Sequence, residues 1–467
     1  MRLFNTLSGE KEELQKSAGE KFTMYFCGPT VYNYAHIGNF RTYLLQDVLV
    51  RTLNACGYNT CFARNITDVD DKTIRDSIKE GVSLKLFTGK WTKIFHEDCD
   101  KLNMLHPTFE PKATENIKEQ IDIINDLVNK GFAYISKDGS VYFNVRKFDR
   151  YGELSRLNKR QISTQEFDSA GKKNLADEYD REQVADFALW KASKPEDGEN
   201  FWESPWGNGR PGWHIECSAM ANKYLGPTID LHSGGVDLKF PHHENEIAQS
   251  ECFSGKKFSK HWMHISHLLV DGVKMSKSLK NLYTLNDIVS RGFSPESLRY
   301  ALISAHYKQP LNFTFDSLVA SQNALMKLYT FSEKIGATDQ TPHTPPVATD
   351  WKFFGSAFDE LTDDLNTPGC IGNIFKTINE TDLTSLSEDD KEKMRKEFEI
   401  LMYCLGLRLG TGKIKKEIPD EIKELAHTRW QLKLEKKFDE ADKIRKKISE
   451  LGWNIKDSKD GYSIEMI

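Results

Sequence analysis

The chain has 467 residues, of which 39% are hydrophobic and 28% charged, and its mean hydropathy is −0.57. This composition is typical of globular proteins and argues against a disordered or membrane-embedded chain. No run of 18 apolar residues exists, so no transmembrane helix is predicted. The charged N-terminal stretch around Arg2 and Glu10 lacks the apolar segment of a signal peptide, so we expect a cytoplasmic protein with about three domains.

The eight cysteines are scattered along the chain, and we expect most of them to be reduced and buried as small apolar residues. The net charge of −5 gives no overall basic surface for nucleic acid. Residues 411–467, however, hold 14 Lys+Arg against 12 Asp+Glu. This mildly basic segment permits RNA contact without demonstrating it.

The first part of the chain has the pattern of a βαβ unit. Residues 22–27 form an apolar strand pattern, Gly28-Pro29-Thr30 interrupts it, and a helical pattern runs from about His36 to Gly57. Residues 60–66 form a second strand pattern. A strand, a helix and a strand in this order predict an α/β fold with a parallel sheet.

An inserted domain is predicted from about 115 to 225. Residues 112–130 have the pattern of an amphipathic helix, and Asp138-Gly139 lies between two short strand patterns as in a β-hairpin. The polar residues 156–186 within this segment predict a surface loop. The α/β pattern then resumes with a strand at 228–236, a helix at 242–252 and a strand at 264–270.

The last third of the chain, from about residue 315, is predicted to be helical. Residues 338–346 form a breaker-rich linker between helices. Residues 428–451 predict one long charged helix whose apolar stripe is Leu434, Phe438, Ala441, Ile444 and Ile448. This helix could contact RNA or simply cover the core, and the sequence does not separate these alternatives.

Two short motifs carry the strongest functional signal. His36-Ile-Gly-Asn39 opens a predicted helix after a strand, where free N–H groups and the helix dipole favour phosphate. Lys274-Met-Ser-Lys-Ser278 follows a predicted strand about 240 residues later, and Lys277 can neutralise charge on a triphosphate. Alone, the first is more often a helix start with a buried histidine, and the second can be a solvated basic loop. Together, in this order, they indicate activation of a carboxylate by ATP.

Further candidates for nucleotide contact are Gly38, Gly234, Gly235 and Asp237. Gly38 allows adenine or ribose to approach the backbone. The two other glycines follow a strand end, where ligands bind in α/β sheets, and Asp237 could accept from ribose hydroxyls. An ordinary Gly-Gly turn explains the same residues nearly as well.

Four possible metal ligands accompany these motifs. His242 and Glu246 are four residues apart on a predicted helix, so they share one face. Cys27 ends the first strand, and Cys217 lies in a separate segment. Two thiolates, an imidazole and a carboxylate suit Zn²⁺, although this is not a zinc-finger spacing. His243, beside His242, is the main competing ligand.

The chain resembles the cysteinyl-tRNA synthetases, a family of class I aminoacyl-tRNA synthetases, from about Met1 to its C-terminus. The segments that carry the resemblance are the lysine motif and Cys27-Gly-Pro-Thr-Val-Tyr32, Asn65-Ile-Thr-Asp-Val-Asp-Asp-Lys72, Asp186-Phe-Ala-Leu-Trp-Lys191, Gly212-Trp-His-Ile-Glu-Cys217 and Phe240-Pro-His-His-Glu-Asn-Glu246. The resemblance implies a Rossmann-type catalytic domain with a parallel sheet. It also implies that a connective insertion splits this domain and that an α-helical anticodon-binding domain follows it.

The resemblance also implies roles for individual residues. Cys27, Cys217, His242 and Glu246 match the family's zinc ligands, and Thr67, Trp213 and His232 match residues of its amino-acid pocket. His36 and Asn39 match the first and last positions of the HIGH motif, where Asn39 replaces a histidine. Lys274 and Lys277 match the lysines of KMSKS, and Lys277 is the ATP-binding one.

The implied domain division follows the same family. Its parts are the first Rossmann half (1–115), the connective insertion (116–225), the second Rossmann half (226–270), the lysine loop with a stem-contact region (271–325), a helical anticodon-binding bundle (326–410) and a small tRNA-binding region (411–467). The implied partners are tRNA(Cys), cysteine and ATP with Mg²⁺, with one Zn²⁺ per chain. We expect a monomer that does not bind a membrane.

The implied reaction is activation of cysteine to cysteinyl-adenylate, followed by transfer to tRNA(Cys). A hydrophobic pocket separates cysteine from serine poorly, whereas a soft zinc ion binds a thiolate far better than a hydroxyl. We therefore expect the substrate sulfur at an open zinc position, and no stretch is assignable to an editing domain. The alternatives are a cysteine ligase acting on an amino sugar and a non-catalytic relative that binds tRNA or zinc. Residues 350–467 argue against the first alternative, and the intact motifs argue against the second.

Overall fold

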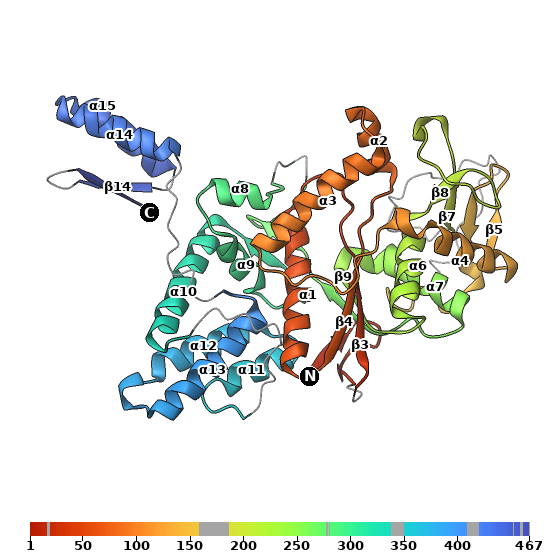
Figure 1. The fold of residues 1–467 in the computed structure, drawn as a ribbon, viewed down its shortest axis with the longest axis horizontal. Coiled ribbons are helices and arrows are strands. Elements are labelled where there is room, and N and C mark those ends of the chain that lie inside the picture. The colour runs from red at the N-terminus through yellow and green to blue at the C-terminus, as the bar shows by residue number, and fades with distance from the viewer. Residues whose placement is uncertain are drawn as a thin grey trace.

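The computed structural model of the chain describes residues 1–15, 19–157, 186–276, 279, 281–337, 350–408, 420–451, 453–457 and 461–466 (Figure 1). Most of the predicted loop 156–186, the predicted linker 338–346 and Lys277 lie outside the described residues. Within those residues, none of the helices combines the length and the apolar composition that crossing a membrane requires.

A four-stranded parallel sheet lies at the centre of the fold, with the strand order β10-β9-β3-β4. Its strands are β3 (Lys21–Phe26), β4 (Asn59–Arg64), β9 (Ile229–Gly235) and β10 (Ser259–Ile265). Helix α1 (Ile37–Ala55) connects β3 to β4, and α7 (Glu244–Ser254) connects β9 to β10. The predicted parallel sheet and the predicted strands at 22–27, 60–66 and 228–236 are therefore confirmed to within two residues.

The order of this sheet reverses between β3 and β9. From β3 the chain moves outward to β4, and from β9 it moves outward on the other side to β10. In open α/β sheets, ligands bind in the crevice at the carboxyl ends of the strands where this reversal occurs. The end of β3, at Cys27, and the end of β9, at Gly235, meet at this position.

The prediction of one strand over residues 264–270 is wrong. Strand β10 ends at Ile265, and the Ser266 amide donates to the Tyr307 carbonyl at 2.8 Å. The chain then enters a second sheet with the order β12-β11-β13, formed by β11 (Leu268–Val270), β12 (Val273–Lys274) and β13 (Leu311–Phe313). The apolar pattern is continuous across both strands, so only the change of pairing partner reveals the break.

The segment between β4 and β9 carries a separate antiparallel sheet with the order β5-β6-β7-β8. Its strands are β5 (Ala133–Ile135), β6 (Val141–Phe143), β7 (Phe187–Ala192) and β8 (Gly209–Pro211). The predicted helix 112–130 forms a 3₁₀ turn, η1 (Ala113–Asn116), followed by α4 (Ile117–Asn129). The hairpin at Asp138-Gly139 is confirmed, with Gly139 at φ +87°.

The remaining elements of this part of the chain lie before and after β9, and β1 and β2 among them form a two-stranded sheet. Before β9 they are β1 (Arg2–Asn5), β2 (Glu10–Glu13), α2 (Asp71–Glu80), α3 (Leu84–Lys101), η2 (Val145–Lys147), η3 (Pro195–Asp197) and α6 (Trp213–Leu225). After β9 they are η4 (Val236–Leu238), the π-helical turn η5 (Lys239–His243), α8 (Leu285–Ser290), α9 (Pro295–Ile303), α10 (Phe315–Lys334), α11 (Gly355–Thr362), α12 (Thr367–Glu380), η6 (Leu383–Ser385) and α13 (Glu388–Leu405). The predicted change to a helical region after residue 315 is thus confirmed.

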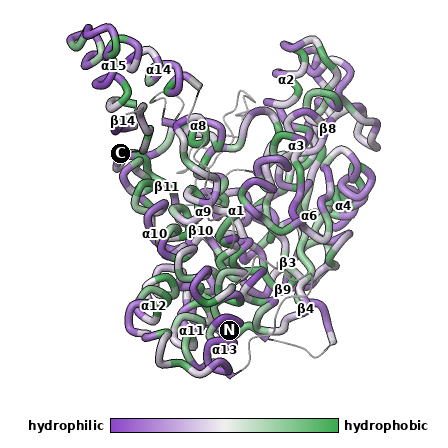
Figure 2. The backbone as a smooth tube through the Cα atoms, turned by 60° about the vertical axis from the view of Figure 1, so that its left-hand side comes forward, coloured by the Kyte–Doolittle hydropathy of each residue, from purple (hydrophilic) through white to green (hydrophobic). Residues whose placement is uncertain are grey.

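The predicted single helix 428–451 is instead two helices, α14 (Asp420–Leu434) and α15 (Phe438–Glu450), followed by the hairpin of β14 (Trp453–Asp457) and β15 (Tyr462–Met466). Lys436 turns the chain with φ +60°. Leu434 and Phe438, at this break, are 62% and 56% exposed, whereas Ala441 and Ile448 of the predicted stripe are buried. Figure 2 shows hydrophilic and hydrophobic residues alternating along both helices, a pattern that continues across the break.

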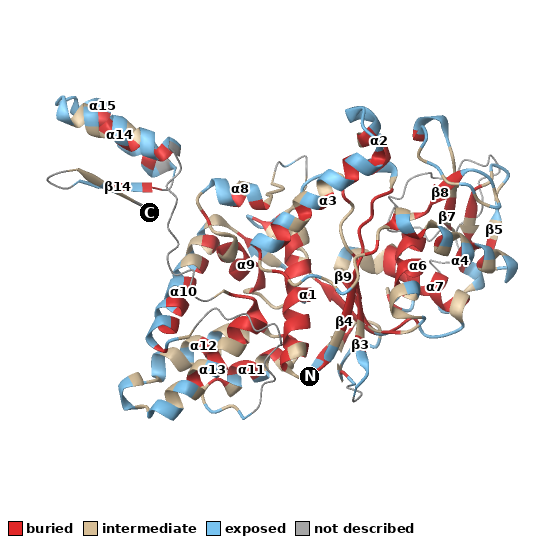
Figure 3. Ribbon diagram, in the orientation of Figure 1, coloured by how far each residue is buried: buried red, intermediate tan, exposed pale blue. Residues whose placement is uncertain are grey.

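Helix α1 is largely buried beside the central sheet, as Figure 3 shows. Fifteen of its 19 residues are buried. Its buried polar side chains therefore need partners, because an unpaired buried polar group is costly. Arg41, for example, donates to four backbone carbonyls, those of Ser266, His267, His306 and Gln309.

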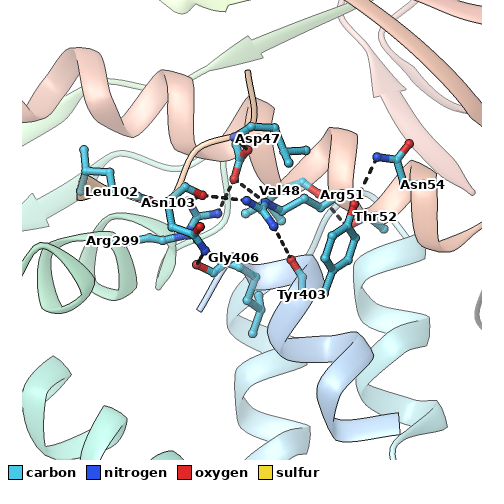
Figure 4. Close-up of polar contacts among 12 residues, drawn as sticks. Asp47, Val48, Arg51, Thr52, Asn54, Leu102, Asn103, Arg299, Tyr403 and Gly406 are labelled. Carbon is cyan, nitrogen blue, oxygen red and sulfur yellow. Dashed lines mark hydrogen bonds and ion pairs between the residues drawn. The ribbon is translucent and has the colours of Figure 1, made fainter. Parts of the chain in front are cut away.

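A buried charged junction fastens α1 to the helical region (Figure 4). The Asp47 carboxylate accepts from Arg51 Nε at 2.8 Å and from Arg299 Nη2, on α9, at 2.5 Å. The two guanidinium groups also donate to carbonyls at the ends of α3 and α13, namely Leu102, Asn103, Tyr403 and Leu405. Helix C-termini favour cations, so these ends stabilise the second positive charge of the junction.

Candidate active site

A cavity of about 470 Å³ opens at the carboxyl ends of β3 and β9. This volume lies in the usual range for sites that bind small molecules. Eleven of the predicted site residues line it: Cys27, His36, Gly38, Asn39, Thr67, Trp213, Cys217, Gly235, Asp237, His242 and Lys274. Glu246, His232 and Gly234 do not line it, and Lys277 lies outside the described residues.

His36 caps the start of α1 and has a defined tautomer as a result. Its Nδ1 accepts from the Asn39 amide at 3.2 Å, and the Asn39 side-chain oxygen accepts from the His36 amide at 3.1 Å. A neutral imidazole that accepts at Nδ1 carries its proton at Nε2. Burial lowers the pKa of His36, in spite of nearby Asp237, and so favours this neutral form. His36 therefore offers an Nε2–H donor beside the first turn of α1. The side-chain Nδ2 of Asn39 offers two further N–H groups there.

The two motifs, far apart in sequence, meet at this cavity. The Ile37 amide donates to the Tyr283 carbonyl at 2.8 Å, just beyond the lysine motif. A Cβ on Gly38 would lie 3.3 Å from the sulfur of Met275, so the glycine allows this close approach. Lys274, at the end of β12, reaches the same cavity. The described residues on either side of Lys277 thus lie against the start of α1.

The predicted metal ligands converge in one buried group. One ligand atom from each of Cys27, Cys217, His242 and Glu246 lies within 4.8 Å of the others. The four come from the end of β3, from α6, from the π-helical turn and from α7. All four residues are buried. This donor set can hold a metal ion, with two soft sulfurs, one nitrogen and one oxygen.

Hydrogen bonds orient the imidazole and the carboxylate of this group. His242 Nδ1 lies 2.8 Å from His214 Nδ1, and His242 Nε2 lies 3.0 Å from Glu246 Oε1. The other carboxylate oxygen of Glu246 lies 2.9 Å from His232 Nε2. Such partners fix the orientation and tautomer of metal ligands. His232 is thus fully buried behind Glu246 and does not reach the cavity wall.

A second, overlapping group includes His243. It consists of Cys27, His232, His243 and Glu246, again with ligand atoms within 4.8 Å. His243 Nε2 lies 3.4 Å from the Cys27 sulfur, and its Nδ1 lies 2.8 Å from His264 Nε2. His243 and His232 do not line the cavity, whereas Cys217 and His242 do. The second group therefore reaches the cavity through Cys27 alone.

The pKa values of the Cys217 thiol and the Glu246 carboxyl favour the ionised forms of these two groups, whereas burial raises the pKa of the Cys27 thiol. Burial lowers the pKa of His242, but Glu246 and Cys217 outweigh it and raise this pKa to about 10. A hydrogen bond from Cys27, and then the nearby His242, lower the pKa of the Cys217 thiol to about 6 against the effect of burial. Burial favours the neutral form of Glu246, but His232 and His242 outweigh it and lower its pKa to about 2. A thiolate and a carboxylate are therefore already ionised near neutral pH, as metal ligands must be.

The remaining predicted residues lie at the same crevice. Trp213, the first residue of α6, places its ring 4.2 Å from that of His242 between centroids. Thr67 is held against the segment after β3, since its amide donates to the Pro29 carbonyl at 3.0 Å. At Gly234 a Cβ would lie 2.8 Å from His243 Cε1, so this glycine serves packing of the histidine.

Sequence reasoning missed two contributors, His214 and Met275. His214 lies in the stretch that supplies Cys217, and Met275 lies within the lysine motif. Their residue types gave little signal, because a neighbour of a ligand and an apolar residue of a loop are common. Only the folded arrangement shows that His214 bonds His242 and that Met275 approaches Gly38.

Comparison with known proteins identifies the family. Residues 13–323 match the family model for the class I (C) tRNA synthetase catalytic domain. A protein of Opitutus terrae named cysteine–tRNA ligase is 50% identical, with 100% of this chain and 99% of that protein covered. A cysteine–tRNA ligase of Brachyspira hyodysenteriae is 42% identical, with 98% of each covered.

Solved structures agree on the fold. Mycobacterium tuberculosis methionyl-tRNA synthetase bound by methionyl-adenylate superposes with a TM-score of 0.54 at 12% identity, covering 83% of this chain and 90% of that one. The LeuRS of Agrobacterium radiobacter, in a ternary complex with tRNA and LeuAMS, gives 0.57 at 12% identity, covering 84% of each chain. The chain therefore belongs to the class I aminoacyl-tRNA synthetases, in the cysteine–tRNA ligase family.

Proposed function

We propose that the protein activates cysteine with ATP in this cavity and transfers the cysteinyl group to tRNA(Cys). One observation carries the proposal: a buried Cys, Cys, His and Glu group opens on the same cavity as both nucleotide motifs. An amino acid bound through its side chain at this group would place its carboxylate toward the start of α1.

We propose that Cys27, Cys217, His242 and Glu246 hold one Zn²⁺. The donor set suits zinc, because thiolate sulfurs select soft or borderline ions and His214 and His232 support the other two ligands. Bound there, zinc would supply a thiophilic centre that distinguishes a thiol from a hydroxyl. The group with His243 is less suitable, since Cys27 is its only member that lines the cavity, whereas Cys27, Cys217 and His242 of the first group all do.

Around the reacting atoms, the chain supplies position and charge. The substrate carboxylate oxygen forms a bond to the α-phosphorus of ATP, and the bond to the bridging oxygen breaks, releasing pyrophosphate. Three groups would donate to phosphate oxygens: the Nε2–H of His36, the side-chain Nδ2 of Asn39 and the free backbone N–H groups at the start of α1. Lys274 and Lys277 would neutralise charge that develops on the leaving pyrophosphate, with Mg²⁺ on the triphosphate.

Other residues would orient the substrates. The Asp237 carboxylate, beside Gly235 at the cavity, would accept from the ribose hydroxyls of ATP. Trp213 and Thr67 would flank the cysteine side chain. His232 is proposed to act through Glu246, whose carboxylate it holds, because His232 itself is fully buried behind the wall.

In the second step, a ribose hydroxyl of the terminal adenosine of tRNA would attack the cysteinyl carbonyl, and AMP would leave. We propose that residues 1–115 and 226–270 form the catalytic domain and residues 116–225 the connective insertion. Residues 271–325 would carry the lysine loop and contact the tRNA stem. Residues 326–410 would bind the anticodon, and residues 411–467 would form a small further tRNA-binding region. A cysteine ligase that acts on an amino sugar would not need these last parts, and the relatives match across the whole chain.

The decisive test uses the purified full-length protein with zinc. Cysteine-dependent exchange of pyrophosphate into ATP, and charging of tRNA(Cys), are both expected, together with about one zinc per chain by elemental analysis. Exchange without tRNA charging, but with ligation of cysteine to an amino sugar, would favour the ligase alternative. Folded, zinc-loaded protein without any exchange would contradict the proposed activity.

A further inference from the structure

A pair of aromatic rings lies at the cavity and has no part in the steps described above. Tyr34, in the turn before α1, and Trp91, on α3, line the cavity and pack edge to face with ring centroids 5.0 Å apart. Tyr34 is 48% exposed, so part of its ring is accessible to a ligand. Helix α3 is itself fixed on α1, since Phe95 packs against Phe40 and Tyr43.

One lysine amine lies beside a ring of this pair, and a second lies beside another tyrosine of the cavity wall. Lys72, which also lines the cavity, lies 5.7 Å from the ring centroid of Tyr32, and Lys90 lies 4.9 Å from that of Trp91. Lys90 also forms an ion pair with Glu80 at 3.5 Å. Lys72 makes no ion pair with a carboxylate among the described residues, so its charge is available to a ligand.

Aromatic rings near lysine amines are typical of sites that bind single-stranded nucleic acid. Single-stranded nucleic acid is bound by aromatic rings that stack on bases and by cations that contact the backbone. In the proposed function, the start of α1, Asp237 and the lysine segment would contact the nucleotide of ATP. Tyr34 and Trp91 belong instead to the wall formed by the turn before α1 and by α3.

We infer that Tyr34 and Trp91, with Lys72, bind the unpaired 3′-terminal nucleotides of the tRNA. This inference rests on the proposed function, in which the terminal ribose must reach the activated carboxyl group inside the same cavity. The unpaired nucleotides that precede it must then pass the cavity wall. A base stacked on the exposed Tyr34 ring, with phosphates near the Lys72 amine, holds this strand in the direction that the transfer requires.

The test separates the two steps of the reaction in the full-length protein. Tyr34→Ala is expected to lower kcat/KM for charging of tRNA(Cys) about tenfold or more, the order expected for loss of one stacked base. Pyrophosphate exchange, which needs no tRNA, is expected to keep the wild-type rate and the wild-type KM for ATP and cysteine. Tyr34→Phe keeps the ring and should charge tRNA almost normally. Leu86→Ala is the matched control, since Leu86 lies on α3, is 69% exposed and does not line the cavity.

A shortened tRNA identifies the part of the RNA that is bound. Wild-type protein should bind intact tRNA(Cys) more tightly than tRNA without its unpaired 3′ nucleotides, and Tyr34→Ala should remove this difference. An equal loss of affinity for both RNAs would overturn the inference, and so would impaired exchange, which would assign the ring to ATP or cysteine. Wild-type protein without exchange or charging would instead refute the proposed function itself.

Discussion

Replacing Asp47 by asparagine tests the buried junction that ties α1 to the helical region. The Asp47 carboxylate serves two guanidinium groups, Arg51 and Arg299, and all three side chains are at most 3% exposed. Removing one partner of a buried ion pair costs about 3–5 kcal/mol, because the other charge stays buried without compensation. Asparagine keeps the volume and the acceptor for the Leu105 amide, so the loss reports charge rather than a cavity. We expect Asp47→Asn to lose about 4 kcal/mol of unfolding free energy at pH 7.

Denaturant unfolding followed by tryptophan fluorescence measures this loss. Asp363→Asn is the matched control, because Asp363 pairs with Arg2 and Lys11 at the surface and should cost about 1 kcal/mol or less. A loss at Asp47 no larger than that at Asp363 would refute the reasoning. In a double-mutant cycle, Arg299→Met should cost much less when Asp47 is already asparagine, since the two side chains share one interaction.

The dependence on pH has a definite sign. Burial favours the neutral carboxyl of Asp47, but Arg51 and Arg299 outweigh it and hold its pKa below the ordinary value. A lowered folded-state pKa contributes stability above the unfolded pKa of about 3.9, and this stability is lost as the pH falls toward the folded pKa. The difference between wild type and Asp47→Asn should therefore be constant from pH 5 to pH 8 and shrink below about pH 4.

Three further changes have expected outcomes. Gly406→Ala should destabilise the protein by at least about 1 kcal/mol in the same unfolding assay, because Gly406 has φ +65° and its Cβ would overlap the Arg299 guanidinium. His36→Ala should lower the rate of pyrophosphate exchange roughly 10²-fold, with a smaller change in KM for cysteine, since it removes the donor that we propose for the reacting phosphate. Cys217→Ser should lower the zinc content measured by elemental analysis, and an unchanged zinc content would exclude Cys217 as a ligand.

Local signals predicted the parts of the fold that local interactions determine. The strand ends at Cys27 and Gly235 and the helix start at His36 follow from apolar patterns and breakers, so the crevice between β3 and β9 could be expected. The break at Lys436 could not, because the charged amphipathic pattern continues through it and helical spacing carries no sign of a left-handed residue. The change of sheet after Ile265 could not be predicted for a similar reason, because it results from the pairing of Leu268–Val270 with Leu311–Phe313.

The sequence predicted most residues of the candidate site, but not which of them line the cavity and which lie behind its wall. The residue types and the family resemblance together indicated Cys27, Cys217 and His242, and the structure brings them to one cavity. The sequence could not show that His232 lies behind Glu246, because a single sequence does not indicate how far a residue lies below the surface. The junction around Asp47 could not be predicted either, because Arg299 lies on another helix, 252 residues from Asp47 in the sequence.

The most direct test of the account is pyrophosphate–ATP exchange with cysteine and with serine, before and after removal of bound metal. The account predicts exchange with cysteine alone, and loss of the exchange or of its preference for cysteine once the metal is removed. Folded protein that keeps a full preference for cysteine without metal would contradict the proposed role of Cys27, Cys217, His242 and Glu246.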